Sequence, residues 1–193
     1  MQIKAFKEWT VICQALAQAD QSLIIRKGGI SEGKSGFSFE SERFLLFPTY
    51  FHAQNDKIKS AHVELRKEHE LGDQIELTHL AELTYTCSVA KWETVQALDE
   101  FHIWSEETMR ERFDWQKKSD QSKSLIKDLV HVAIVRIYEL PEPFVMTYER
   151  AHHGCKSWID IKEVPELLIE KAEPVLSQRQ HESKVAELKA ILI

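Results

Sequence analysis

The chain has 193 residues, of which 43% are hydrophobic and 29% charged, and it contains five Trp and nine Phe. This length and composition predict one globular domain with its own core, and they exclude a largely disordered chain. The formal net charge is −6, from 25 basic and 31 acidic residues, which excludes a protein that holds a polyanion through an overall positive field. Any contact with nucleic acid must therefore be local.

Residues 1–20 carry charges and glutamines where a signal peptide has its apolar stretch, and no apolar run approaches the ~20 residues that cross a bilayer. We therefore expect a cytoplasmic protein with no membrane partner. The cysteines, Cys13, Cys87 and Cys155, form no CxxC pair, which predicts reduced thiols rather than disulfides or a closed zinc site. We expect the fold to need no metal and no cofactor.

Residues 4–19 are predicted to form a helix, because apolar residues recur at spacings of three and four, namely Phe6, Trp9, Cys13 and Leu16. Two apolar runs, residues 23–26 and 43–47, predict strands, and Pro48 is expected to end the second one. The loop between them holds four of the chain's six glycines and follows Arg26 and Lys27. Glycine serves where the backbone takes positive φ or a ligand approaches closely, so this loop predicts a shaped site.

The middle of the chain contains its clearest alternation of apolar and polar side chains, over residues 75–89. This pattern predicts a strand so long that it must bend or bulge. A short alternation at residues 37–40 predicts another strand. Ser105, followed by Glu106 and Glu107, predicts the start of a helix.

A nearly unbroken apolar and β-branched run at residues 129–140 predicts a central strand that Pro141 and Pro143 are expected to stop. Further strands are predicted at residues 144–148 and 158–161. The predicted core domain therefore covers residues 1–162.

The remainder, residues 163–193, has apolar residues at helical spacings in an otherwise charged sequence. It predicts a C-terminal helical appendage of two helices, separated near Pro174. These helices are expected to pack on the core domain or to mediate a homo-oligomer.

The order of the predicted elements lacks regular βαβ alternation. It predicts an α+β fold with a mainly antiparallel, strongly bent sheet or small β-barrel, flanked by helices. This strand pattern is similar to that of PUA-like domains, whose members hold RNA or a flipped modified base.

Four segments carry a resemblance to a known family: RKGGI, FLLFPTYFH, VRIYELPEP and HHGCKSWIDI, which begin at residues 26, 44, 135 and 152. They resemble the bacterial and cyanobacterial family known as domain of unknown function 1802, over residues 6–161. Some members of that family carry an Mrr-type restriction endonuclease domain. The resemblance therefore implies a role associated with restriction and modification or with defence.

Seven residues are candidates for binding a nucleotide or a modified nucleic-acid base: Arg26, Lys27, Gly28, Gly29, Tyr50, His52 and Trp158. Two cations beside the amides of a glycine turn suit a phosphate, and aromatic rings next to basic residues suit a stacked base. The alternative is a tight hairpin turn flanked by solvated charges, with the aromatic residues in the core.

Other interpretations remain open. His152, His153 and Cys155 are candidates for a metal site or a Cys/His nucleophile, although a loop that enters a strand explains them more simply. His79 lies on the apolar side of its predicted strand and is expected to be a hydrogen-bonded core residue.

A metal-dependent nuclease of the PD-(D/E)xK type is the alternative function, with Asp160 and Lys162 as the second element and Glu139 or Glu149 as the first acid. A non-enzymatic interaction protein that acts through its C-terminal helices is the third interpretation. The sequence leaves open whether the protein is an enzyme.

Overall fold

A computed structural model describes residues 1–27, 38–50, 54–59, 69–114, 129–154 and 156–193. Its strands are β1 (Ile3–Trp9), β2 (Leu23–Lys27), β3 (Arg43–Thr49), β4 (Gln74–Val89), β5 (Val130–Thr147), β6 (Trp158–Ile161) and β7 (Glu173–Pro174). Its α-helices are α1 (Thr10–Ala17), α2 (Trp92–Ala97), α3 (Glu106–Phe113), α5 (Glu166–Glu170) and α6 (Gln178–Leu192). Short 3₁₀ turns lie at Gln54–Lys57, Asp99–Phe101 and Arg150–His152.

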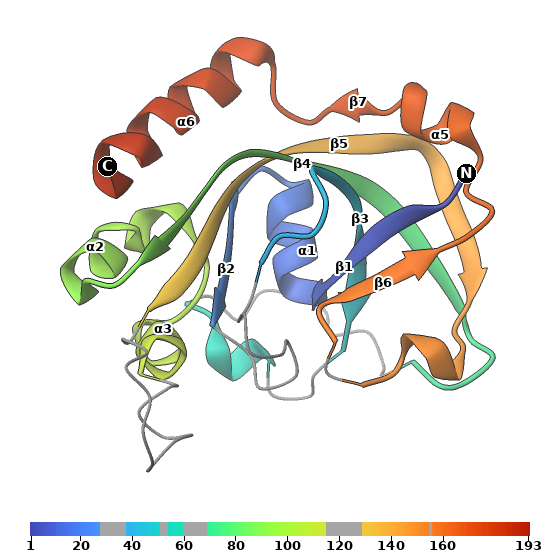
Figure 1. The fold of residues 1–193 in the computed structure, drawn as a ribbon, viewed down its shortest axis with the longest axis horizontal. Helices are drawn as coiled ribbons and strands as arrows, with labels where there is room; N and C mark the ends of the chain where they lie inside the picture. The colour runs from blue at the N-terminus through green and yellow to red at the C-terminus, as the bar shows by residue number, and fades with distance from the viewer. Residues whose placement is uncertain (28–37, 51–53, 60–68, 115–128, 155) are drawn as a thin grey trace.

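The described strands form one strongly curled sheet in the order β2-β5-β4-β3-β1-β6, with β7 paired to β5 (Figure 1). The pair β1–β3 is parallel, and the other described pairs are antiparallel. The predicted α+β fold with a mainly antiparallel, strongly bent sheet is thus confirmed. The described strand order is that of a half-barrel, with β2 and β6 at its two ends. These ends approach each other where Arg26 Nη2 donates a hydrogen bond of 2.8 Å to Ser157 Oγ, just before β6.

The long strands β4 and β5 pair over most of their length and supply the predicted bulges. Opposite Thr78, β5 inserts residues 140–143, so the ladder resumes only at the pair Leu77 and Phe144. Pro141 and Pro143 therefore interrupt the pairing, but β5 continues to Thr147, and the expectation that they end the strand is wrong. A proline without an N–H is tolerated in such an insertion because no ladder hydrogen bond is lost there.

The predicted helix over residues 4–19 is wrong in its first half, because residues 3–9 form β1. This strand lies between β3 and β6, so both of its faces are covered, and adjacent residues such as Ala5 and Phe6 are fully buried. A strand buried on both faces loses its period of two. The spacing of three and four that remains is that of a helix, although within residues 4–19 only α1, Thr10–Ala17, is helical.

Strands β2 and β3 are confirmed, but they do not pair with each other, and the alternative of a tight hairpin is wrong. β2 pairs with β5, whereas β3 lies between β1 and β4. Pro48 does not end β3, because it is still in register with Glu8 of β1. Residues 38–40 have no regular structure, so the strand expected at residues 37–40 is not formed by them, and Phe37 lies outside the described residues.

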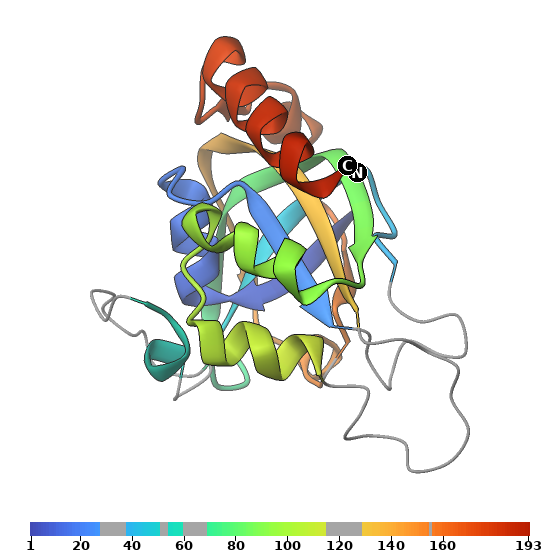
Figure 2. The same cartoon turned by 90° about the vertical axis from the view of Figure 1, so that its left-hand side faces the viewer.

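The helices cover the curl from several sides. α1 packs against β1, β3 and β5, strands that are not all neighbours, so it lies inside the curl. α3 begins at Ser105, whose side chain accepts a hydrogen bond from the Thr108 N–H, and it packs against β2 and α2. Figure 2 shows α2 and α3 along one side of the sheet and α6 above it.

The C-terminal segment forms the two predicted helices, with β7 between them. α6 packs against α2, β4 and β5, and it contributes Leu188 to the largest core cluster. Val164 and Ile169 belong to the second cluster. The division into residues 1–162 and 163–193 stays a prediction, which truncation after Glu163 would test. No described helix is long and apolar enough to cross a membrane.

Candidate functional site

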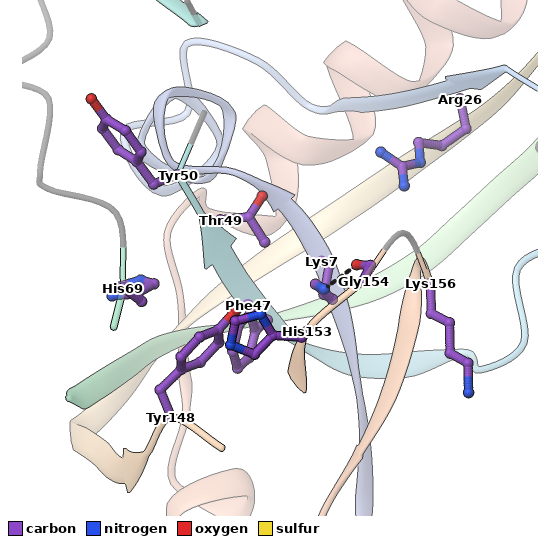
Figure 3. A pocket seen from close by; sticks show the side chains of 10 residues that line it. All are labelled: Lys7, Arg26, Phe47, Thr49, Tyr50, His69, Tyr148, His153, Gly154 and Lys156. Atoms are coloured by element: carbon purple, nitrogen blue, oxygen red, sulfur yellow. Dashed lines mark hydrogen bonds between the residues drawn. The ribbon is translucent and has the colours of Figure 1, made fainter. Parts of the chain in front are cut away.

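Five segments that are far apart in sequence line one cavity of about 270 Å³. β1 and the end of β2 supply Lys7 and Arg26. β3 and its end supply Phe47, Thr49 and Tyr50, and the segments around β5 and β6 supply Tyr148, His153, Gly154 and Lys156, with His69 beside them (Figure 3). Three of these side chains are cations, and none of the described lining residues is acidic. We call this site the basic cavity.

Lys7 anchors the loop that precedes β6. Its side chain is buried, and its Nζ donates hydrogen bonds of 2.7 Å to the carbonyl oxygens of His152 and Gly154. Gly154 has a φ of +86°, a conformation that side chains with a Cβ rarely adopt. The loop thus turns its carbonyl groups toward the lysine and carries His153 and Lys156 to the cavity (Figure 3).

Arg26 connects the cavity to a buried charge cluster. Its Nη1 lies 3.6 Å from Glu8 Oε2, and the Glu8 side chain is fully buried. Glu8 Oε2 has no hydrogen-bond partner in the described part of the chain, so the ion pair is what compensates its burial. The guanidinium also lies 5.0 Å from the Phe6 ring centre, which fixes its position at the cavity wall.

Arg112 lies behind this pair and stays out of the cavity lining. It donates to the carbonyl of Ile25, and its guanidinium lies 3.7 Å from the Trp104 ring centre. Burial first, and then the charge of Arg26, lower the pKa of Arg112 to about 10, against the opposing effect of Glu8. Arg112 is therefore still a cation at neutral pH. Glu8 thus has two positive charges near it, those of Arg26 and Arg112.

Aromatic rings form the opposite wall of the basic cavity around Tyr148. The ring centre of Tyr148 lies 4.8 Å from His153, 5.5 Å from His69 and 6.3 Å from Phe47. His152 lies behind them, and its Nδ1 accepts a hydrogen bond from the Glu149 N–H. Burial lowers the pKa of His152, with Lys7 and His153 adding to the effect and Glu149 opposing it.

The structure places the seven candidate binding residues in different surroundings. Arg26 and Tyr50 line the basic cavity, with the Tyr50 hydroxyl directed away from the other rings (Figure 3). Lys27 is half-buried at the end of β2, and the described lining does not include it. Trp158 is a core residue, 8% exposed, whose ring packs against Phe6 and Phe44. Gly28, Gly29 and His52 lie outside the described residues.

Sequence reasoning missed several lining residues, above all Lys7 and Tyr148. Lys7 falls within the predicted helix over residues 4–19 and outside its apolar stripe, whereas in the structure β1 buries it. The available signal was two adjacent charges, Lys7 and Glu8, enclosed by the aromatic residues Phe6 and Trp9. Tyr148 follows the end of β5, and the tight turn at Arg150–His152 brings its ring beside His153.

The acidic residues considered for a metal-dependent nuclease lie on different elements of the fold. Asp160 is exposed on β6 and pairs with Lys4 at 3.2 Å, and the hydrogen bond from Lys4 lowers the pKa of its carboxyl group. Glu149 caps the turn at residues 150–152, and Glu139 is in register with Glu173 of β7. Among the described residues no three His, Cys, Asp or Glu are grouped to hold a metal ion.

The described cysteines, Cys13 and Cys87, are free thiols, and burial raises the pKa of each. Cys155 lies outside the described residues. His79 is half-buried and forms a 2.8 Å hydrogen bond with the Thr78 hydroxyl, and burial lowers its pKa. His79 is thus hydrogen-bonded as predicted, although it is not fully buried.

Comparison with known proteins gives one sequence match and a few structural ones. Residues 5–187 match the family described as "Domain of unknown function (DUF1802)". No curated protein matches the chain. The crystal structure of ASCH from Zymomonas mobilis is similar at 12% identity and a TM-score of 0.47, over 88% of this chain and 95% of that one. A mutant of the same protein gives 9% identity and a TM-score of 0.43, over 96% and 94% of the two chains. Sequence identities and TM-scores this low say nothing about the ligand or the chemistry of this chain.

Proposed function

This chain belongs to the family described as Domain of unknown function (DUF1802), and we propose that it is a binding module that takes a nucleotide or a nucleic-acid base into the basic cavity. The observation that carries this proposal is the convergence of Arg26, Lys7 and Lys156 with a wall of aromatic rings at one cavity. The family resemblance adds a role in defence to the proposal, and the protein would act in the cytoplasm.

The two walls of the basic cavity suit the two parts of a nucleotide. A base stacks on aromatic or imidazole rings, as Tyr148 and His153 provide, at a gain of about 1–3 kcal/mol per base. A phosphate accepts charge-assisted hydrogen bonds from Arg and Lys, as Arg26 and Lys156 provide on the other side. No acidic group of the described lining faces the phosphate, although Glu8, behind the cavity wall, offsets part of the charge of Arg26.

The size of the basic cavity limits what it holds. Its volume of about 270 Å³ lies just below the range of small-molecule sites, which measure about 300–1,000 Å³. One base or one nucleoside phosphate is the appropriate size. Because the molecule as a whole is acidic, binding rests on this local group of cations rather than on a general positive field.

Fluorescence anisotropy of short labelled single strands at low salt tests the proposal, with nucleoside monophosphates as competitors. Lys156→Ala should weaken binding by about tenfold, because it removes a charge-assisted contact from an exposed side chain. Lys171→Ala, an exposed lysine outside the cavity lining, is the matched control and should bind as the parent does. Binding should also weaken as salt is raised. If both variants bind like the parent, the nucleotide does not use the basic cavity.

A further inference from the structure

A second cavity, of about 420 Å³, lies between β3 and the first half of β4, beneath α1. It exists because the β3–β4 ladder is short. The two strands pair from Arg43 to Leu45 on β3, and beyond this point β3 is in register with β1 while β4 is in register with β5. Side chains from both strands then line an opening, which we call the β3–β4 slot.

The slot adjoins the basic cavity. Alternate residues of a strand point to opposite faces, and β3 gives Phe47 and Thr49 to the basic cavity but Leu46 and Pro48 to the slot. His69 lines both. The two cavities thus lie on opposite sides of the end of β3, and the imidazole of His69 borders both. Because β3 and β4 do not pair there, space is left between the two strands.

The chemistry of the slot differs from that of the basic cavity. Its described lining contains no lysine or arginine, and Glu76 adds a negative charge, so it does not suit a phosphate. It offers instead the side-chain amide of Gln14 and the apolar surfaces of Leu46 and Ile75. The amide of Gln74 also lines it, with its Nε2 donating a hydrogen bond to Thr147 Oγ1 at 3.1 Å. Amide side chains pair with the edge of a base, and adenine in particular takes a bidentate contact from glutamine.

We propose that the β3–β4 slot binds the base of a second nucleotide, linked to the one in the basic cavity, so that the ligand of this protein is a single strand of at least two nucleotides. This inference rests on the proposed function of the basic cavity. The phosphate between the two nucleosides would then pass the end of β3 near His69. A single nucleotide fills only the basic cavity.

The test compares a nucleoside 5′-monophosphate with 5′-phosphorylated dinucleotides that carry adenine as the second base, by isothermal titration. The dinucleotide should bind about tenfold more tightly, the gain expected of one bidentate base contact. Gln14→Ala should remove this gain and leave the affinity for the monophosphate unchanged. Ala17→Phe, which fills the slot from the last turn of α1, should do the same, and its melting temperature checks that it is folded.

Gln18→Ala is the matched control, because Gln18 is exposed at the end of the same helix and does not line the slot. It should keep the full gain. Equal affinity for the two ligands, or a gain that survives both slot variants, would overturn the inference while the basic cavity remains a nucleotide site. Failure of the monophosphate to bind would instead contradict the function proposed for the basic cavity.

Discussion

Arg26 has two roles at the scale of single residues. It lines the basic cavity, where it is available to a ligand, and it also faces the fully buried carboxylate of Glu8. The sequence placed it at the exit of a strand, and charges there are seldom needed for packing. In the folded protein, however, removal of Arg26 takes the ion-pair partner from a buried carboxylate oxygen. Loss of binding in an Arg26 variant therefore needs a stability measurement beside it.

We predict that Arg26→Ala lowers the free energy of unfolding by about 1–3 kcal/mol, the cost of leaving a buried polar group without its partner. The loss should be smaller when Glu8 is already changed to Gln, because the charge that needs Arg26 is then absent. Urea unfolding of the parent, the two single variants and the double variant measures this. Equal losses in both backgrounds would show that Arg26 and Glu8 are not coupled.

His102 is a buried titratable group away from the cavity. It is 5% exposed, and neither ring nitrogen has a hydrogen-bond partner in the part of the chain that the structure describes. Burial first, then Lys59 and Arg112, lower its pKa to about 4, with Asp99 opposing. The unfolded chain has a histidine pKa of about 6.5. Between these pH values the unfolded state binds the proton and the folded state does not.

We therefore predict that the protein is most stable above about pH 6.5 and loses stability as the pH falls toward 4, with His102 accounting for on the order of 3 kcal/mol. His79, His152 and His181 also have lowered pKa values and act in the same direction. His102→Phe should flatten the dependence. Urea unfolding at pH 7.0, 5.5 and 4.5 measures it, and an unchanged slope in the variant would refute the assignment.

Among the elements, α6 contacts both the sheet and the main core cluster. Its Leu188 is 1% exposed within the main core cluster, and His181 Nε2 lies 3.0 Å from the Thr84 hydroxyl of β4. Its N-terminal residue Gln178 accepts a hydrogen bond from Arg136 of β5. Self-association through this helix stays a hypothesis, because any partner would have to use the face that these contacts leave exposed.

We predict that Leu188→Ala lowers the free energy of unfolding by about 2–4 kcal/mol, through lost burial and the cavity that remains. Leu167→Ala is the matched control: Leu167 is also helical but 55% exposed, and its replacement should cost less than about 0.5 kcal/mol. Chemical denaturation with far-UV circular dichroism compares the two. Similar small losses would mean that α6 does not contribute to the core.

Long strands with a clear hydrophobic pattern could be predicted from the sequence. The short strand β1, which is covered on both faces, could not. The alternation of β4 and the apolar run of β5 identify those strands, and Ser105 marks the start of α3. β1 was missed because its two covered faces remove the alternation on which strand prediction depends. Parallel pairing of β1 with β3 joins segments more than thirty residues apart, and no local pattern encodes it.

For the molecule as a whole, the curl of the sheet creates the site. The motifs that begin at Arg26, Phe44 and His152 each contribute to the lining of the basic cavity: Arg26, Phe47 with Thr49 and Tyr50, and His153 with Gly154 and Lys156. Composition and motif spacing could locate these segments. They could not assign Trp158 to the core or Lys7 to the cavity, because both depend on which strand lies beside which.

The most direct test of the central claim is a crystal structure of the protein soaked with a nucleoside 5′-monophosphate. We expect the base to lie against the rings of Tyr148 and His153, with its phosphate within hydrogen-bond distance of Arg26 or Lys156. An ordered nucleotide bound elsewhere on the surface, with the basic cavity empty in the same crystal, would contradict the account.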